Sequence, residues 1–220
     1  MNGGIDMRTA LLTLALLSTT VGMASAATAS LQVEVEGIQQ DNAIPETFAL
    51  CKPTTDGKST AGTNQRPTLR WSGAPEDTKS FAVIVKDPDV PADFADADKE
   101  GKTVAKDAPR QLFYHWAVTG IPASQTELKG GDAKTPPRLG TQHVNSLGTY
   151  VPTPAQYGGP CPPWNDARTH RYHFTVYALD KDFRVKKEAS AADVEKQLQD
   201  HVLASGTVTG SYSLNAALKP

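Results

Sequence analysis

The stretch HRYHFTVYALD, residues 170–180, constrains the fold more than any other part of this sequence. It is rich in aromatic and β-branched residues, which favour strands. Further apolar runs within 31–38, 69–71, 81–85 and 114–122 predict more strands, and the 16 prolines and 17 glycines of the chain supply turns between them. This pattern predicts a mostly β fold.

Two connections in this pattern can be read more finely. Residues 69–85 predict a hairpin, in which Gly73-Ala74-Pro75 turns between two paired strands. Residues 92–110 are strongly charged, and residues 130–159 are rich in Gly, Pro and Thr. Irregular tracts of this length in a compact domain are often functional.

One amphipathic helix is expected near the C-terminus. Ser190 can cap its first turn, and Gly206 lies just beyond its expected end. Its apolar positions recur at the helical spacing: Val194, Leu198 and Val202. The segment TVTGSYSL that follows predicts a final strand.

The first 26 residues predict a secretory signal peptide. Arg8 precedes an apolar run from Ala10 to Leu17, and Ala24-Ser25-Ala26 is a small-x-small cleavage signal. The apolar run is too short to span a bilayer. We therefore expect residues 27–220 to form a single domain that is periplasmic or secreted and is not an integral membrane protein.

The net charge and the cysteines limit the possible functions further. A formal net charge of −2 argues against a nucleic-acid partner, because such modules usually carry a basic face. In an oxidising compartment Cys51 and Cys161 can form one disulfide, which leaves no free cysteine. The alternative is that both are buried free thiols. Their spacing is not that of a C-x-x-C redox site.

Side-chain alternation divides the crowded start of the 170–180 segment. On a strand His170 and Tyr172 share one face, and Arg171 and His173 share the other. The two histidines cannot then bind one metal ion, and no Cys/His spacing predicts zinc. The acidic tract after Pro91 lacks the pattern of an EF-hand. We expect no metal and no cofactor.

Two other segments place polar groups where an apolar strand ends. Asp87 and Asp89 follow the run 81–85, with Pro91 shortly after them, and His115 begins the run 114–122. Carboxylates at such a place are costly unless they are paired or hydrogen-bonded, and closing an Asx-type turn is the simplest explanation.

The segments FAVIVKDPDVP, YHWAVTGIP and GGPCPP…HRYHFTVYALD together resemble the phosphatidylethanolamine-binding proteins, also called Raf-kinase-inhibitor-like proteins. The resemblance extends over residues 31–214. It implies a Greek-key β-sandwich with few peripheral helices and a small surface pocket for anions. It assigns to that pocket Asp87, His115, His170 and Tyr172, with Gly159 and Pro160 at the rim.

The resemblance has further implications for single residues. Family members often have a cis peptide bond at the position of Val90-Pro91. The similarity of Cys51 and Cys161 to the cysteines of exported bacterial members implies that the two pair. Asp87 is expected to orient an imidazole, and Asp89 either does the same or only closes the turn. Arg171 is expected to form a structural ion pair.

The sequence departs from the bacterial branch of the family in the long link between D-P-D-x-P and H-W, residues 92–114. This link could form a lid or a surface for a partner. The NQRPTLRW segment also resembles eukaryotic members more than bacterial ones.

We therefore expect a non-enzymatic exported protein that binds a small anion: phosphate, a phosphoethanolamine-like head group or a carboxylate. It could also inhibit or regulate a partner protein such as a kinase or a protease. One alternative is a hydrolase with a His/Asp pair, although no G-x-S-x-G elbow is present. Another is an inhibitor that acts only through the 92–110 loop.

Overall fold

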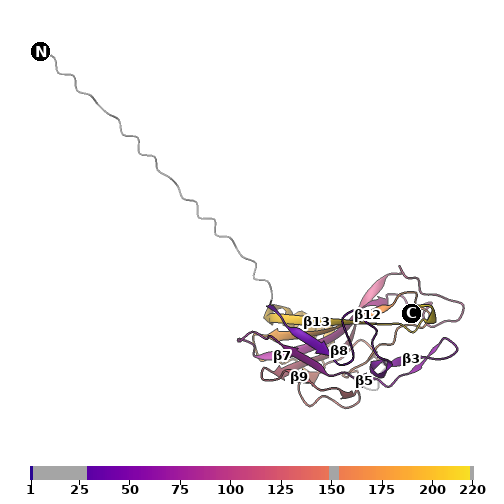
Figure 1. The fold of residues 1–220 in the computed structure, drawn as a ribbon, viewed down its shortest axis with the longest axis horizontal. Coiled ribbons are helices and arrows are strands. Elements are labelled where there is room, and N and C mark those ends of the chain that lie inside the picture. Colours follow the sequence, from indigo (N-terminus) through magenta and orange to yellow (C-terminus); the bar gives the residue numbers. More distant parts are fainter. Residues whose placement is uncertain (2–28, 149–153, 219–220) are drawn as a thin grey trace.

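The computed structural model describes residues 29–148 and 154–218, together with Met1. The expected signal peptide lies outside the described residues. The mostly β prediction is confirmed: two sheets pack face to face, and two further strand pairs extend them (Figure 1). The larger sheet has six strands in the order β1 (Ala29–Ser30), β13 (Val202–Tyr212), β12 (His170–Leu179), β7 (Ser80–Pro91), β8 (Arg110–Pro122) and β11 (Thr141–Gln142).

The smaller sheet has three strands in the order β2 (Gln32–Val35), β6 (Leu69–Ser72) and β9 (Glu127–Leu128). The two extra pairs are β3 (Cys51–Pro53) with β4 (Ser59–Ala61), and β5 (Gln65–Arg66) with β10 (Gly131–Asp132). The helical segments that the described residues contain include α1 (Ala191–Leu198) and the 3₁₀ turns Glu46–Phe48, Gln199–His201 and Ala216–Leu218.

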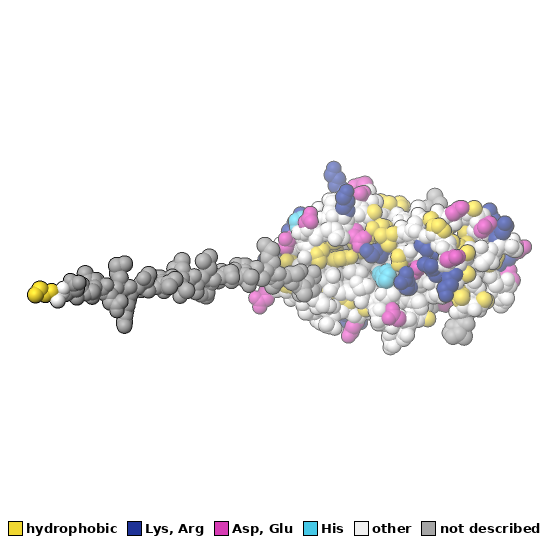
Figure 2. Space-filling model, turned by 90° about the horizontal axis from the view of Figure 1, so that it is seen from above, with side chains coloured by type: hydrophobic (Ala, Val, Ile, Leu, Met, Phe, Trp, Pro, Cys, Tyr) yellow, Lys and Arg dark blue, Asp and Glu magenta, His cyan; other side chains and the backbone are white. Residues whose placement is uncertain are grey.

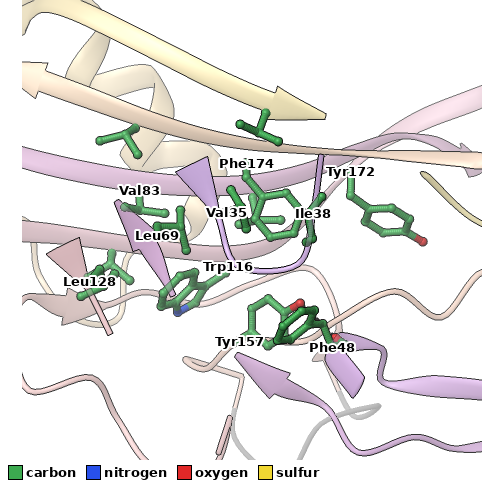
Figure 3. Packing of buried hydrophobic residues seen from close by; sticks show 14 of the residues in the cluster. Val35, Ile38, Phe48, Leu69, Val83, Trp116, Leu128, Tyr157, Tyr172 and Phe174 are labelled. Atoms are coloured by element: carbon green, nitrogen blue, oxygen red, sulfur yellow. Dashed lines mark hydrogen bonds between the residues drawn. The ribbon is translucent and has the colours of Figure 1, made fainter. Parts of the chain in front are cut away.

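Strand β7 is buried on both faces, which explains its nearly continuous apolar sequence. Phe81, Val83 and Val85 face the core between the two sheets. Ala82 and Ile84 face the other way, into a second cluster that α1 covers. Figure 3 shows the inter-sheet cluster, which joins large-sheet residues such as Trp116 and Phe174 to small-sheet residues such as Leu69 and Val35.

The predicted hairpin over residues 69–85 is wrong. Both of its strands exist, but β6 pairs with β2 and β9, whereas β7 pairs with β12 and β8. The chain instead crosses from one sheet to the other at this turn. Trp71 and Phe81 then pack against each other in the core, with ring centroids 5.1 Å apart.

The helix forms as expected at its start but ends early. Ser190 accepts a hydrogen bond from the backbone N–H of Asp193 at 3.1 Å, which caps α1. The helix ends at Leu198, and Val202 already begins β13. Gly206 therefore lies inside a strand, where the carbonyl oxygen of Leu31 would be 2.3 Å from an added Cβ.

Strand β12 confirms the predicted alternation. His170 and Tyr172 are buried, whereas Arg171 is exposed and His173 is partly exposed. Strand β7 runs further than expected, through the D-P-D-x-P motif to Pro91, with an irregular register between Asp87 and Val90. The expected cis bond is wrong: Val90-Pro91 is trans, and Pro91 continues the pairing of β7 with β8.

The face of the molecule that Figure 2 shows carries charges of both signs. Lys and Arg side chains are interspersed with Asp and Glu on the face shown in Figure 2. No helix among the described residues is long and apolar enough to span a bilayer.

Candidate functional site

Three neighbouring strands carry the four predicted pocket side chains. Strand β7 lies between β8 and β12, so that Asp87, His115, His170 and Tyr172 meet at one end of the larger sheet. Their exposed fractions are 1%, 4%, 1% and 1%, respectively. The structure thus brings the four together, but as a closed polar cluster beneath the surface rather than as an open pocket.

The imidazole of His170 lies between two carboxylates. Its Nδ1 is 2.7 Å from Oδ2 of Asp87, and its Nε2 is 3.1 Å from Oδ2 of Asp166. Burial alone would lower the pKa of His170, but the bonds to Asp166 and Asp87 outweigh burial and raise it to about 9. The ring is therefore protonated at neutral pH, with both nitrogens donating.

Asp87 has the orienting role that the resemblance implied, and it also closes a turn. Its Oδ1 accepts the backbone N–H of Asp89 at 2.7 Å, as in an Asx turn. The carboxylate of Asp89 neither orients an imidazole nor closes the turn, the two roles expected of it. It accepts instead from Arg171, at 2.8 and 3.0 Å, and from Arg168 at 3.2 Å. The expected structural ion pair of Arg171 is thereby identified.

Tyr172 lies beside both imidazoles. Its ring centroid is 5.1 Å from that of His115 and 6.5 Å from that of His170. In Figure 3 it lies at one end of the inter-sheet cluster, with its hydroxyl directed away from Phe174. Burial, and then the charge of Asp87, raise the pKa of Tyr172 well above its usual value, so the hydroxyl keeps its proton.

His115 has one satisfied and one unsatisfied ring nitrogen. Its Nδ1 donates to the carbonyl oxygen of Gly158 at 2.7 Å. Its Nε2 is buried and has no hydrogen-bond partner among the residues that the structure describes. Burial lowers the pKa of His115 against the opposing charge of Asp87, so the ring is neutral and Nε2 carries a lone pair. An unpaired buried polar atom is costly and calls for an explanation.

The expected rim residues hold the loop that carries Gly158. Gly159 donates to Oδ1 of Asn64 at 2.8 Å, and the carbonyl of Pro160 accepts from Leu50 at 3.0 Å. An added Cβ at Gly159 would lie 1.9 Å from the carbonyl oxygen of Phe48, so only glycine fits.

The two cysteines are joined. Cys51 and Cys161 form a disulfide with their Cα atoms 4.7 Å apart, and the described residues contain no free cysteine. The bond ties the rim loop to β3.

Comparison with known proteins decides the family. Residues 35–213 match the family model described as phosphatidylethanolamine-binding protein. The chain belongs to the phosphatidylethanolamine-binding protein family. Protein YbcL of Escherichia coli is 34% identical over 158 residues, which cover 70% of this chain and 74% of YbcL. A UPF0098 protein of Aquifex aeolicus is 32% identical over 190 residues, which cover 86% and 91% of the two chains.

Solved structures of the phosphatidylethanolamine-binding protein family share this architecture. The crystal structure of E. coli YbcL, described as a new member of the mammalian family, matches with a TM-score of 0.64 and 31% identity over 84% of this chain and 99% of YbcL. The Chlamydia trachomatis homologue CT736 matches with a TM-score of 0.61 over 85% and 99% of the chains. At 24% identity, CT736 supports the fold alone.

The long link of this family member is fixed beside the site. The side-chain amide of Asn165 donates to the carbonyl oxygens of Asp96, Lys99 and Lys102 at 2.9–3.2 Å. Asn165 Oδ1 accepts the N–H of Asp98, whose carboxylate accepts the N–H of Trp164. Residues 92–110 therefore form a wall that is bonded to the loop before β12, not a loose lid.

Sequence reasoning missed two charged members of the cluster. Arg110 donates to both oxygens of Asp166, at 2.5 and 3.0 Å, and to the carbonyl of Asp89 at 2.8 Å. These two residues, Arg110 and Asp166, lie outside the segments whose apolar and polar residues predicted strands. Their proximity depends on the folding of the 92–110 link, which the sequence does not reveal.

Proposed function

We propose that this family member is an exported binding protein that holds a small anion, bearing a phosphate or a carboxylate, at the cluster of His115, His170 and Tyr172. The observation that carries the proposal is the buried and unpaired Nε2 of His115. This nitrogen can accept a hydrogen bond from a ligand O–H group, or take up a proton and then donate to an anionic oxygen.

The charges around the cluster favour an anion. His170 is cationic, and Arg110 adds a second positive charge, which Asp87 and Asp166 balance. Arg168 and Arg171 share the single carboxylate of Asp89. The two arginines leave an excess of positive charge over Asp89. This excess, together with a proton on the His115 ring, would compensate the negative charge of a bound anion.

A binding role fits the histidines better than hydrolysis does. A His170 that is protonated at neutral pH is a poor general base. In a hydrolase His115 would be the base, and ester turnover would then depend on its ring. Export is supported by the disulfide, which persists in oxidising compartments, and by the expected signal peptide.

Calorimetric titration of the purified, disulfide-bonded protein with phosphate, phosphoethanolamine and acetate tests the proposal. His115→Asn keeps a donor for the Gly158 carbonyl but removes Nε2, so it should weaken binding at least tenfold. His201→Asn changes a surface histidine that is bonded to Asp180 and should leave binding unchanged.

Equal affinities in wild type and His115→Asn, or no binding of any of the three ligands, would refute the proposal. Turnover of phosphate or carboxylate esters that is lost in His115→Asn would favour a hydrolase. Inhibition of a partner kinase or protease that survives in His115→Asn would instead place that activity in the 92–110 link.

A further inference from the structure

Asp166 occupies the ring nitrogen of His170 that a ligand would otherwise reach. Its carboxylate lies between the imidazolium of His170, at 3.1 Å, and the guanidinium of Arg110, at 2.5 and 3.0 Å. The side chains of Asp166 and His170 are each 1% exposed, and that of Arg110 is 7% exposed. A carboxylate held by two buried cations is what a bound acetate ion would look like here.

The contact is built from the loop and not from the sheet. Asp166 belongs to the segment before β12, whereas His170, Asp87 and Tyr172 lie on strands. Asp87 already orients the ring through Nδ1, so the bond at Nε2 is not needed for orientation. The second carboxylate therefore calls for a reason beyond the placement of the imidazole.

We propose that Asp166 is an internal competitor for the anion, and that it sets which anions the site accepts. The inference rests on the proposed function. A ligand oxygen that bonds to Nε2 of His170 must displace the carboxylate of Asp166.

The displacement requires a side-chain rotation, which also gives up the 2.9 Å bond from the backbone N–H of Arg168 to Oδ1 of Asp166. The backbone on either side of Asp166 is fixed, since Val104 bonds to the carbonyl of Asn165 at 3.1 Å and to the N–H of Ala167 at 2.9 Å. Arg110 donates to both oxygens of Asp166, so the carboxylate can turn from His170 and keep this partner.

Competition of this kind discriminates by charge. A monocarboxylate offers His170 the same charge as Asp166 does, without the advantage of a covalent tether. A phosphate dianion brings more negative charge beside the imidazolium and gains more from the exchange. The wild-type site should therefore prefer phosphate to acetate.

Asp166→Asn tests the inference, because it keeps the shape of the side chain and removes the competing charge. Calorimetry at pH 7 should show that this variant binds acetate at least tenfold more tightly than wild type does. The affinity for phosphate should rise less, so that the preference for phosphate over acetate becomes smaller. Asp107→Asn removes the same formal charge from an exposed position in the 92–110 link and should change neither affinity. In the double variant Asp166→Asn/His170→Asn the gain should be lost.

A second measurement does not depend on the folding of a variant. In ¹⁵N-labelled wild-type protein, saturating phosphate should shift the His170 Nε2 resonance, which is assigned in the wild type through its through-bond correlations within the imidazole ring. A ligand that binds without moving this resonance overturns the inference.

The outcomes for the function and for the competitor are distinct. Binding by wild type with no gain in folded Asp166→Asn overturns the competitor and leaves the anion-binding function standing. Absence of anion binding in both proteins overturns the two together. Binding that appears only in Asp166→Asn supports competition by Asp166 but refutes anion binding as the function of the wild-type protein.

Discussion

Nδ1 of His170 lies 2.7 Å from Oδ2 of Asp87, although 83 residues separate them in the chain. Asp166 binds the other ring nitrogen. A single imidazolium thus joins β7, β12 and the loop before β12 at one point. Its charge state should affect the stability of the whole cluster.

The pH dependence of stability should report this imidazolium. Folding raises the pKa of His170 from 6.5 to about 9, so the stabilisation is fully present below about pH 6.5 and is lost as the pH rises through about 9. The loss is on the order of 3 kcal/mol. Urea unfolding from pH 6 to pH 10 should show the decline in wild type and a flatter profile in His170→Asn. A wild-type midpoint that stays constant from pH 7 to pH 10 would contradict the assignment.

Anion binding should take up a proton at His115. Burial keeps the free ring neutral, and a bound anion beside Nε2 favours its charged form. Acetate keeps its single charge between pH 8 and pH 6, so its affinity should rise as the pH falls over this range. Titrations in two buffers with different ionisation enthalpies measure the protons taken up. Identical heats in the two buffers would argue against the coupling, and His115→Asn should abolish it.

The Cys51–Cys161 disulfide should contribute strongly to stability. Its cysteines are 110 residues apart, and the chain-entropy model gives roughly 5 kcal/mol for a loop of that length. Reduction should lower the unfolding midpoint of wild type, whereas a Cys51→Ser/Cys161→Ser double variant should not respond to reductant. Labelling of unreduced wild type with a thiol reagent should detect no free thiol.

Gly159→Ala should destabilise the rim of the site by more than about 2 kcal/mol. Its Cβ would lie 1.9 Å from the carbonyl oxygen of Phe48, so the backbone of one of the two segments has to move. Gly101→Ala is the matched control: nothing lies within 4 Å of its Cβ, and only its φ of +70° opposes the change. That variant should lose about 1 kcal/mol. Equal losses in thermal unfolding would mean that the rim is not tightly packed.

The two buried tryptophans of the core should respond differently to replacement by phenylalanine. Nε1 of Trp116 donates to Gln142 at 2.7 Å, whereas Nε1 of Trp71 is buried without a partner among the described residues. Trp116→Phe leaves an amide oxygen unsatisfied and should cost about 1–3 kcal/mol more than Trp71→Phe. Chemical denaturation of the two variants measures the difference, and a larger loss in Trp71→Phe would reverse the interpretation.

The positions of the long strands, including those that carry the site residues, were largely predictable, because they depend on residues that are adjacent in the sequence. Alternation alone placed His170 and Tyr172 on one face of β12 and Arg171 on the opposite face, and the structure buries the first of these faces. The resemblance named Asp87 and His115 as their neighbours. The helix start at Ser190 was readable for the same reason, since a cap is recognised from a few adjacent residues.

The errors concern relations between distant segments. The turn after β6 has the residues of a hairpin, but β7 lies inside the larger sheet, where the smaller sheet covers one of its faces and α1 covers the other. Val202 continued the helical spacing, yet it pairs in β13 with Leu179 of β12. A residue pattern indicates a strand or a helix without indicating its partner.

By itself, the sequence determined the long strands, the opposite faces of His170 and Arg171 on β12, and the family motifs that are present, because these follow from the two-residue period of a strand and from short motifs. Only the tertiary structure decided that β6 and β7 belong to different sheets and that Nε2 of His115 is buried without a partner. It also placed Asp166, clamped by Arg110, on the free nitrogen of His170. Ion pairs and desolvation depend on distances between groups that lie far apart in the chain, and those distances exist only after folding.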